Sequence, residues 1–389
     1  MLCRGSLKGS LREPRGTQHA LPSCPSGVRD ERQVHFTSRR ATMMIPRGFE
    51  PFKVFRLCRG IPVRFVSSIA VLLYFGPLLA HAAPPQRALA PESINSAEWS
   101  GGPPPKDRIT PLGIRVQVLL DRARFSPGEI DGKFGENARK ALRAFAEAQQ
   151  LPFAGELTQE IWQKLVADDR PVLTQHTIAP KDVAGPFLGK LPSRMEDLNH
   201  LPRLNYTSPR QELAENFHMS EELLSTLNPD QHFDRAGVAI NVAAIAVPDT
   251  KSQAVEKVEI DKQSQTVEAF DKAGKLISFY PATVGSEEKP SPSGALKVTS
   301  VHFNPTYGYN PEYRFKGVRS KKPFTIEPGP NNPVGTVWIN LSAEGYGIHG
   351  TAYPGKVSKA QSHGCVRLTN WDAEHLARQV KKGTSVIFD

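Results

Sequence analysis

The residues best suited to chemistry lie in one short segment of the chain. Cys365 lies in Ser362-His363-Gly364-Cys365-Val366-Arg367, and a second histidine, His349, lies 16 residues before it. A thiol becomes a strong nucleophile when a neighbouring imidazole removes its proton. Backbone N–H groups can then stabilise the oxyanion that forms when the thiolate attacks a carbonyl. The segment therefore predicts acyl transfer with Cys365 as the nucleophile.

Two histidines are candidates for the base that activates Cys365. His349 follows Tyr346-Gly347-Ile348, which is typical of a strand. His363 belongs to the cysteine segment itself, and in an extended chain residues two apart point to the same face. The spacing leaves both open. The alternative for His349 is a satisfied core histidine, and for His363 a brace for the loop.

The neighbours of Cys365 indicate how a substrate could be held. Glycine lets the backbone approach a substrate closely, so the N–H groups of Gly364 and Cys365 are expected to line an oxyanion hole. Ser362 is expected to orient an imidazole. Arg367 is expected to bind a carboxylate through its planar guanidinium. For Ser362 and Arg367 the alternative is a role in bracing the loop.

The positive charge of the chain is concentrated in its first part. The formal net charge is +10, but residues 1–82 hold 13 Lys and Arg against 4 Asp and Glu, whereas residues 83–389 hold 36 against 35. Nucleic acid is therefore not an expected partner of the main part. Residues 1–42 are typical of neither a globular domain nor a signal, and translation is expected to start at Met43 or Met44.

Residues 1–82 are predicted to be a leader that contains an export signal. The segment from Lys53 to Arg64 is basic, Phe65 to Leu79 is mostly apolar, and Ala80-His81-Ala82 is a small-x-small cleavage site. A membrane span needs about 20 apolar residues, which is longer than this run. We therefore expect export without stable membrane insertion after cleavage, and this favours the periplasm.

A metal site and simple core packing are the alternatives to nucleophilic chemistry at Cys365. Zinc could be held by His349, His363 and Cys365, but the spacing lacks the Cys-x-x-Cys and His-Glu-x-x-His patterns. A buried structural cysteine is common. However, residues 83–389 contain no second cysteine, and a lone thiol is unusual in an exported chain unless it is buried or reactive. The sequence contains no metal, nucleotide or other cofactor motif.

Two segments follow the leader. Residues 83–107 are rich in Pro, Ala, Ser and Gly and are predicted to be a linker. Residues 108–168 are predicted to be a small all-α module, because apolar residues recur at helical spacing from Leu112 to Leu120 and from Ala138 to Phe145, and Thr158 can cap a third helix. This module resembles the three-helix peptidoglycan-binding domain. The matching elements are Val116 to Leu120, Ile130 to Gly135, Ala144 to Ala146 and Trp162 to Leu165.

A second small module is predicted over residues 204–247. The pattern is βααβ, with a strand at 205–207, two helices of which the second is capped by Ser220, and a closing strand at 237–247. This arrangement resembles a degenerate LysM module. The family's Gly-Asp-Thr-Leu is replaced here by Pro209-Arg210-Gln211-Glu212-Leu213, so glycan binding and a purely structural role both stay open.

Residues 254–389 are predicted to form a mainly-β domain with one C-terminal helix. The helix is placed at 370–382, with Thr369 or Asn370 as its cap. A hairpin turn is expected at Asp271-Lys272-Ala273-Gly274. Alternation of apolar and polar residues places the strands at 258–261, 265–270, 275–284, 295–303, 337–341, 346–349 and 384–388.

The same domain resembles the YkuD-type L,D-transpeptidases. The resemblance rests on Ile348-His349-Gly350-Thr351 followed, after a gap, by the segment from Ser362 to Leu368. Further matching elements are Tyr280 to Gly285, Ser291 to Gly294, Pro328 to Gly335, Leu376 and Gly383 to Val386. The family implies a cysteine-dependent acyltransferase without a cofactor, with roles in peptidoglycan biosynthesis, cell-wall biogenesis and cell shape.

The resemblance also implies a reaction. Cys365 would form a thioester with a tetrapeptide stem and release D-alanine, with His349 as general acid and base and His363 in support. The acyl group would pass to an amine, which forms a cross-link or attaches a protein. Tyr346 and Trp338 are expected to wall the donor site. An L,D-carboxypeptidase that uses water, and a non-catalytic protein that binds the cell wall, stay open as alternatives. The partners implied are peptidoglycan stem peptides and glycan.

Overall fold

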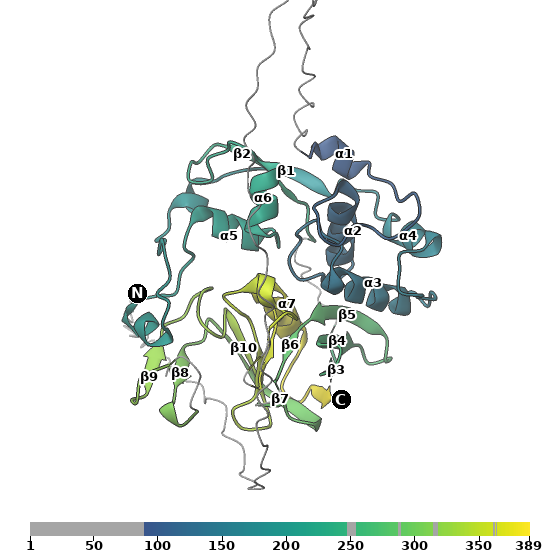
Figure 1. Ribbon diagram of the computed structural model, residues 1–389. Coiled ribbons are helices and arrows are strands. Elements are labelled where there is room, and N and C mark those ends of the chain that lie inside the picture. The colour runs from purple at the N-terminus through teal and green to yellow at the C-terminus, as the bar shows by residue number, and fades with distance from the viewer. Residues whose placement is uncertain (1–88, 247–253, 287–288, 314–317, 361, 363) are drawn as a thin grey trace, which may run out of the picture. The chain divides into compact units, whose positions relative to one another are not determined.

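The computed structural model describes residues 89–246, 254–286, 289–313, 318–360, 362 and 364–389 (Figure 1). The leader with its predicted export signal lies outside the described residues, and so does His363. Within the described part of the chain, no helix is long and apolar enough to cross a membrane.

Three helices form the first predicted module, and the all-α prediction is confirmed. They are α2 (Pro111–Arg122), α3 (Glu136–Ala148) and α4 (Gln159–Leu165). The α2 helix begins where Thr110 Oγ1 accepts a hydrogen bond from the Gly113 N–H at 3.0 Å. Helix α4 begins at its predicted cap, because Thr158 Oγ1 accepts from the Ile161 N–H at 3.4 Å. The apolar faces of the three helices share one core.

The predicted linker is wrong for part of its length. Residues 91–95 form helix α1 (Pro91–Asn95), and the side chain of Ile94 is fully buried. Asn95 Oδ1 accepts hydrogen bonds from the backbone N–H groups of Val172 and Leu173 at 2.8 and 2.9 Å. The Pro-rich composition suggested a free chain, but the buried isoleucine and the Asn95 amide attach this segment to the folded part, together with the bonds from Arg115 to Ala97 and Glu98.

The second module has the predicted helices but a different first strand. Its elements are α5 (Pro209–Asn216), α6 (Glu221–Leu227) and β2 (Ala239–Ala243). β2 pairs in antiparallel fashion with β1 (Leu173–Thr177), and no strand forms at 205–207. At that position the Thr207 N–H donates to Gln211 Oε1 (2.7 Å), so the chain enters α5 instead. The predicted first strand is therefore wrong, and β1 takes its place.

The last part of the chain is a nine-stranded sheet with one helix, which confirms the mainly-β prediction. The strand order is β5-β4-β3-β13-β7-β10-β11-β12-β6. Tyr307–Tyr309 (β8) and Phe324–Ile326 (β9) form a separate two-stranded sheet. The strands of the large sheet are β3 (Lys257–Asp261), β4 (Thr266–Phe270), β5 (Leu276–Pro281), β6 (Thr283–Val284), β7 (Gly294–Phe303), β10 (Val337–Leu341), β11 (Gly347–His349), β12 (Val366–Arg367) and β13 (Ser385–Phe388).

The single strand predicted over 275–284 is two strands at opposite ends of the sheet order. β5 is the first strand of that order and β6 is the last, yet only Ala282 lies between them in the chain. The two ends of the sheet must therefore approach each other at this residue. Short 3₁₀ helices connect other elements of the chain, at Pro180–Val183, Met195–His200, Pro311–Tyr313 and Pro354–Lys356.

The pairing of neighbouring strands places their residues in two cross-strand rows. One row is apolar, and the other, called the polar row here, is mostly polar. Residues that lie opposite each other in neighbouring strands point to the same face of a sheet. The apolar row, in spatial order, is Val301, Ile339, Ile348, Val366 and Val284. The adjacent row, in the same order, is His302, Trp338, His349, Arg367 and Thr283.

Helix α7 (Asn370–Gln379) covers the apolar face of this sheet. Leu376 and Ala373 pack in one core with Ile348 and Val366, and the helix lies beside β10 in Figure 1. It begins where Thr369 Oγ1 accepts from the Asp372 N–H at 3.2 Å, so the predicted cap is confirmed as Thr369. The polar row, with His349 and Arg367, is left for the opposite face.

Candidate active site

The turn that carries Cys365 is held by two serine hydroxyls. Ser362 Oγ donates a hydrogen bond to the Cys365 carbonyl (2.6 Å) and accepts one from the Gly364 N–H (3.3 Å). Ser291 Oγ donates to the Gly364 carbonyl at 2.7 Å. Gly364 has φ of +106°, which residues with a side chain rarely adopt, and the Tyr346 ring leaves little room for a Cβ there. These contacts fix the direction in which the cysteine side chain leaves the backbone.

Two of the predicted site residues bond to each other at this turn. Among the described residues, the Ser362 hydroxyl bonds to Gly364 and Cys365 and so braces the turn, whereas its predicted role toward an imidazole stays a prediction. The Gly364 N–H, predicted to line the oxyanion hole, is engaged by Ser362. It can stabilise an oxyanion only if this 3.3 Å bond is given up when substrate binds.

Cys365 lies in a small apolar cluster. The residue is 7% exposed and packs with Val334 and Trp338. Its Sγ lies 3.6 Å from the Gly345 carbonyl oxygen. Cys365 precedes the apolar-row residue of β12, so alternation along the strand places it on the opposite face of the sheet, together with His349. The structure thus puts the predicted nucleophile and the predicted base on one face.

His349 is oriented for use of its Nε2 atom. Its Nδ1 lies 2.6 Å from the Gly350 carbonyl oxygen, which can only accept, so Nδ1 carries the proton and Nε2 has the lone pair. The ring stacks on the Trp338 indole, with 5.5 Å between centroids and 16° between planes. Burial, and then the nearby Arg367 guanidinium, lower the pKa of His349 to about 3. The imidazole is therefore neutral at physiological pH.

Arg367 supplies a positive charge beside both residues. It lies next to His349 in the register of β11 and β12. Burial lowers the pKa of Arg367, whereas the neighbouring Cys365 and Tyr307 raise it. Its Nε is buried and has no hydrogen-bond partner among the described residues. A buried guanidinium N–H without a partner is suited to bind an anionic group of a ligand.

The two predicted wall residues have different positions. Trp338 is only 4% exposed, so it forms the floor under His349 and Cys365 rather than an open wall. A Cβ on Gly347 would overlap the indole, which explains the glycine there. Tyr346 is half-buried, and its ring lies over Gly364.

Sequence reasoning gave no site role to two residues that touch the site. Ser291 bonds to the cysteine turn, and Asn370 bonds to the loop after His349. Ser291 lies in the Ser-Pro-Ser-Gly element and Asn370 is a candidate helix cap, so the sequence holds a weak signal for both. Tyr307, at the start of the 307–322 stretch expected to wall the donor cleft, packs against the Cys365 cluster and raises the pKa of Arg367. Within the described part of the chain, no group of three or more His, Cys, Asp or Glu side chains could hold a metal ion.

Two protein-family models match parts of this chain. Residues 256–388 match the family model YkuD, the L,D-transpeptidase catalytic domain. The chain carries a YkuD-type catalytic domain. Residues 114–165 match a second model, described as "putative peptidoglycan binding domain", which coincides with helices α2 to α4. The YkuD match covers the large sheet, both residues of the predicted pair and helix α7.

Several curated proteins are similar to the YkuD domain and its surroundings. "Putative L,D-transpeptidase YkuD" of Bacillus licheniformis is 27% identical over 45% of this chain and 89% of its own length. "Putative L,D-transpeptidase YqjB" of Bacillus subtilis is 32% identical over 29% of this chain, and "Probable L,D-transpeptidase YbiS" of Escherichia coli is 27% identical over 47%. The chain spans 60% of each of these last two proteins.

Solved structures of L,D-transpeptidases are also similar to this chain. The Xylanimonas cellulosilytica enzyme (residues 123–326 of that protein) is 15% identical, covers 75% of this chain and all of its own, and gives a TM-score of 0.33. The catalytic domain of the E. faecium enzyme is 22% identical, covers 36% of this chain and 99% of its own, and gives 0.28.

The low pKa of His349 predicts how stability depends on pH. The unfolded imidazole takes up a proton near pH 6.5, but the folded one stays neutral to about pH 3, so its contribution to stability is present above pH 6.5 and is lost as the pH falls. Between pH 7 and pH 4 this one group should cost roughly 3 kcal/mol of unfolding free energy. We expect the His349→Gln variant to lose less stability than the wild type over this range. Denaturant unfolding of both at pH 7 and pH 4 measures it, and equal losses would refute the assignment.

Proposed function

We propose that the protein is a peptidoglycan L,D-transpeptidase that uses Cys365 as its nucleophile. The thiolate attacks the carbonyl that follows the L-centre of diaminopimelate in a tetrapeptide stem. The C–S bond forms and the C–N bond to D-alanine breaks, while His349 gives the leaving amine its proton. The amine of an acceptor then attacks the thioester, His349 takes up the proton of that amine, and the thiol is released.

One observation carries this proposal: Cys365 and the unprotonated Nε2 side of His349 share one face of the sheet, on a common Trp338 floor. A general base must have a free lone pair, and the bond from Nδ1 to Gly350 supplies that condition. The neutral imidazole has the lone pair that takes the thiol proton, and the thiolate and imidazolium that form then stabilise each other, which raises the pKa of the imidazole in that state. The Arg367 charge favours the thiolate as well. If the lone pair were instead on Nδ1, which faces the Gly350 carbonyl, the imidazole could not act as the base.

Arg367 is the proposed substrate-binding residue. Its buried Nε without a partner suits a carboxylate of the stem peptide, which would restore the missing hydrogen bond. Tyr346, half-buried over the cysteine turn, is proposed as a wall of the donor site, and Trp338 as its floor. Ser362 and Gly364 are proposed to hold the turn in the attacking geometry. The supporting role of His363 is kept as part of the proposal.

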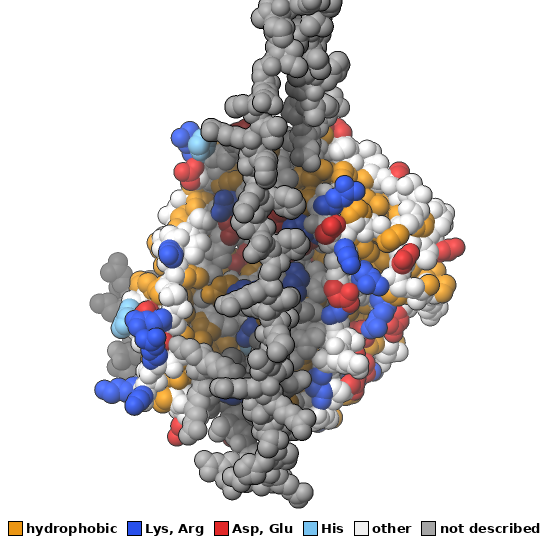
Figure 2. Space-filling model, viewed as in Figure 1, with side chains coloured by type: hydrophobic (Ala, Val, Ile, Leu, Met, Phe, Trp, Pro, Cys, Tyr) orange, Lys and Arg blue, Asp and Glu red, His pale blue; other side chains and the backbone are white. Residues whose placement is uncertain are grey.

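The remainder of the chain supports a substrate in the cell wall. A module that matches a peptidoglycan-binding family would hold glycan strands near the YkuD domain. The leader would direct export, which places the enzyme in the periplasm. Both acidic and basic side chains occur on the face that Figure 2 shows, as expected for a part of the chain with almost no net charge. Such a surface does not favour nucleic acid as a partner.

The acceptor decides between an L,D-transpeptidase and an L,D-carboxypeptidase. The apolar neighbours of the sulfur, Val334 and Trp338, tend to exclude water from the thioester and favour an amine acceptor. Incubation of the purified protein with tetrapeptide stems and mass spectrometry of the products tests this. We expect cross-linked dimers together with released D-alanine.

Other products would change the conclusion in defined ways. Tripeptides without dimers would show that water is the acceptor. Unchanged stems, from protein that is folded and whose thiol is intact, would favour a non-catalytic protein that binds the cell wall. A control for acceptor choice replaces the acceptor stem with a labelled free amine.

A further inference from the structure

The peptide unit between Gly350 and Thr351 is bonded on both sides. Its carbonyl oxygen accepts the proton of His349 Nδ1 at 2.6 Å, and its N–H donates to Asn370 Oδ1 at 3.1 Å. Because a peptide unit is planar and stiff, an atom that holds its N–H also fixes the direction of its C=O. Asn370 therefore determines where the acceptor for His349 points.

Asn370 uses its whole hydrogen-bonding capacity at this position. Its Oδ1 also accepts from the Thr336 N–H at 3.2 Å, and its Nδ2 donates to the Pro330 carbonyl at 3.1 Å and to Glu215 Oε2 at 3.0 Å. The residue is 4% exposed. A Cβ on Gly350 would overlap Asn370 Oδ1, so the loop that follows His349 is fitted to this one amide. A side chain so fully bonded has a single conformation.

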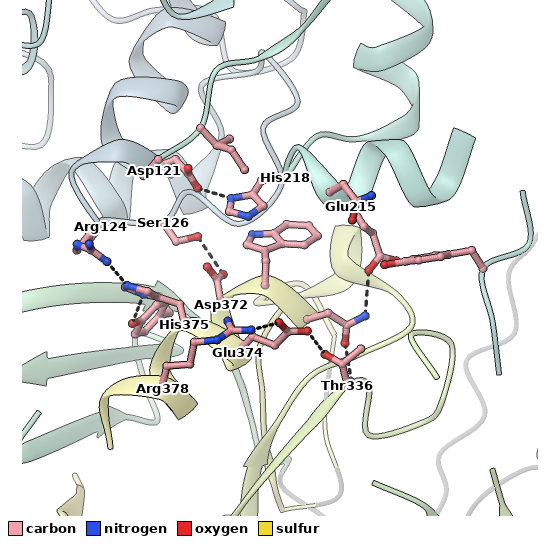
Figure 3. Close-up of a pocket in the computed structure, with 17 residues that line it drawn as sticks. Asp121, Arg124, Ser126, Glu215, His218, Thr336, Asp372, Glu374, His375 and Arg378 are labelled. Carbon is pink, nitrogen blue, oxygen red and sulfur yellow. Dashed lines mark hydrogen bonds and ion pairs between the residues drawn. The ribbon is translucent and has the colours of Figure 1, made fainter. Parts of the chain in front are cut away.

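The last member of this chain of bonds comes from outside the YkuD domain. Glu215 lies on α5, in the module before residues 256–388, and reaches across toward α7 (Figure 3). It is buried, and Gln211 Nε2 donates to its other oxygen at 3.2 Å. Glu215, Thr336 and Asn370 border a cavity of about 640 Å³ between the two parts. A buried carboxylate destabilises the folded state unless hydrogen bonds compensate for its lost hydration. The hydrogen bond between Glu215 and Asn370 is therefore more than a packing contact.

We propose that Asn370 and Glu215 are positioning residues for His349. The bonds run from the imidazole through the Gly350–Thr351 peptide and the Asn370 amide to the Glu215 carboxylate. Successive bonds of this kind polarise one another, so a negative charge at Glu215 strengthens the acceptor that holds Nδ1–H. The module of residues 204–247 thus completes the catalytic site and does more than tether it. This inference rests on the proposed function of His349.

Two substitutions, made singly and together, test this series of hydrogen bonds by exchanging a donor and an acceptor at one of its links. Asn370→Asp keeps the oxygen for the two backbone N–H groups but replaces the donor that faces Glu215 with a second carboxylate. We expect kcat to fall about 10²-fold, as for a small displacement of a catalytic group, with KM changed little. Adding Glu215→Gln supplies a new donor to the introduced aspartate. The double variant should recover to within about threefold of the wild type.

Glu215→Gln alone keeps an acceptor and removes the charge. Burial raises the pKa of Glu215 to about 7, so the charge grows through neutral pH and the variant should lose about fivefold in kcat at pH 8 but little at pH 6. A purely structural contact would not give this pH dependence. Glu212→Gln, on the same helix, is the matched control and should leave kcat unchanged at both pH values. The ionisable groups near Glu215 or in its cavity are Glu129, Tyr206, Glu221, Asp121, Arg124, His218, Tyr280, Asp372, Glu374, His375 and Arg378.

A measurement that needs no turnover separates this inference from the proposed function. The Nδ1–H resonance of His349 in ¹⁵N-histidine-labelled protein, assigned with His349→Gln, should move in Asn370→Asp and return in the double variant. These shifts could occur although neither the wild type nor any variant processes stems. In that case Asn370 and Glu215 do position His349, but the proposed function is wrong. Wild-type kcat and an unmoved resonance in folded Asn370→Asp protein would overturn the inference. If Asn370→Asp does not fold, an unchanged resonance and kcat in Glu215→Gln at pH 8 would do so.

Discussion

Cys365→Ala should abolish transpeptidation while leaving the fold in place. The variant removes the only cysteine among the described residues, and with it the proposed nucleophile, so turnover should fall by at least about 10⁴-fold. The loss of one small buried side chain should cost about 1 kcal/mol of unfolding free energy. Turnover is measured by mass spectrometry of stem products, and folding by denaturant unfolding.

Ser362→Ala is the matched comparison for the cysteine variant. It keeps the thiol but removes both bonds that the hydroxyl makes to the turn, at 2.6 and 3.3 Å. We expect it to slow the reaction by about tenfold, in line with two hydrogen bonds that position rather than react. Cross-linking by folded Cys365→Ala protein would show that another residue attacks the stem and would remove the basis of the mechanism.

His349→Gln should lower kcat/KM by about 10² to 10⁴-fold. The glutamine amide can still donate to the Gly350 carbonyl, so the loop keeps a partner, but it has no lone pair of suitable basicity to take the thiol proton. The same variant should also slow alkylation of Cys365 by iodoacetamide at pH 7, because less thiolate forms. Initial rates of stem processing and of alkylation measure the two effects.

His302→Gln provides the control for this histidine. His302 lies in the same cross-strand row, on the far side of Trp338, and its Nε2 is 2.9 Å from Ser300 Oγ. Its replacement should leave both rates within about twofold of the wild type. If His349→Gln were equally mild, the base would have to be sought elsewhere, and His363, the second candidate, would be the next residue to replace.

Local sequence was sufficient for the elements that depend on near neighbours. The three helices of the first module follow from apolar spacing and from caps such as Thr158, because a helix bonds within its own segment. The strands through Ile260, Ile339 and Val386 follow from alternation in the same way. The wrong predictions concern strands whose pairing partners lie far away in the sequence. β1 was missed because its partner β2 lies on the far side of two helices, and the strand over 275–284 was not divided at Ala282 because only sheet closure separates its halves.

By itself, the sequence indicated which chemistry to propose and in which segment. A cysteine after a glycine, the only cysteine after residue 58 and with histidines near it in the chain, favours a thiol nucleophile with an imidazole base, and the helical and strand patterns limit the fold around it. Only the tertiary structure decided how those groups are held: that Arg367 stands beside His349, that Trp338 lies under both the imidazole and the sulfur, and that Asn370 and Glu215 hold the loop after His349. The physical reason is that these contacts join strands and helices far apart in the chain, whereas residue types and spacing report mainly on neighbours.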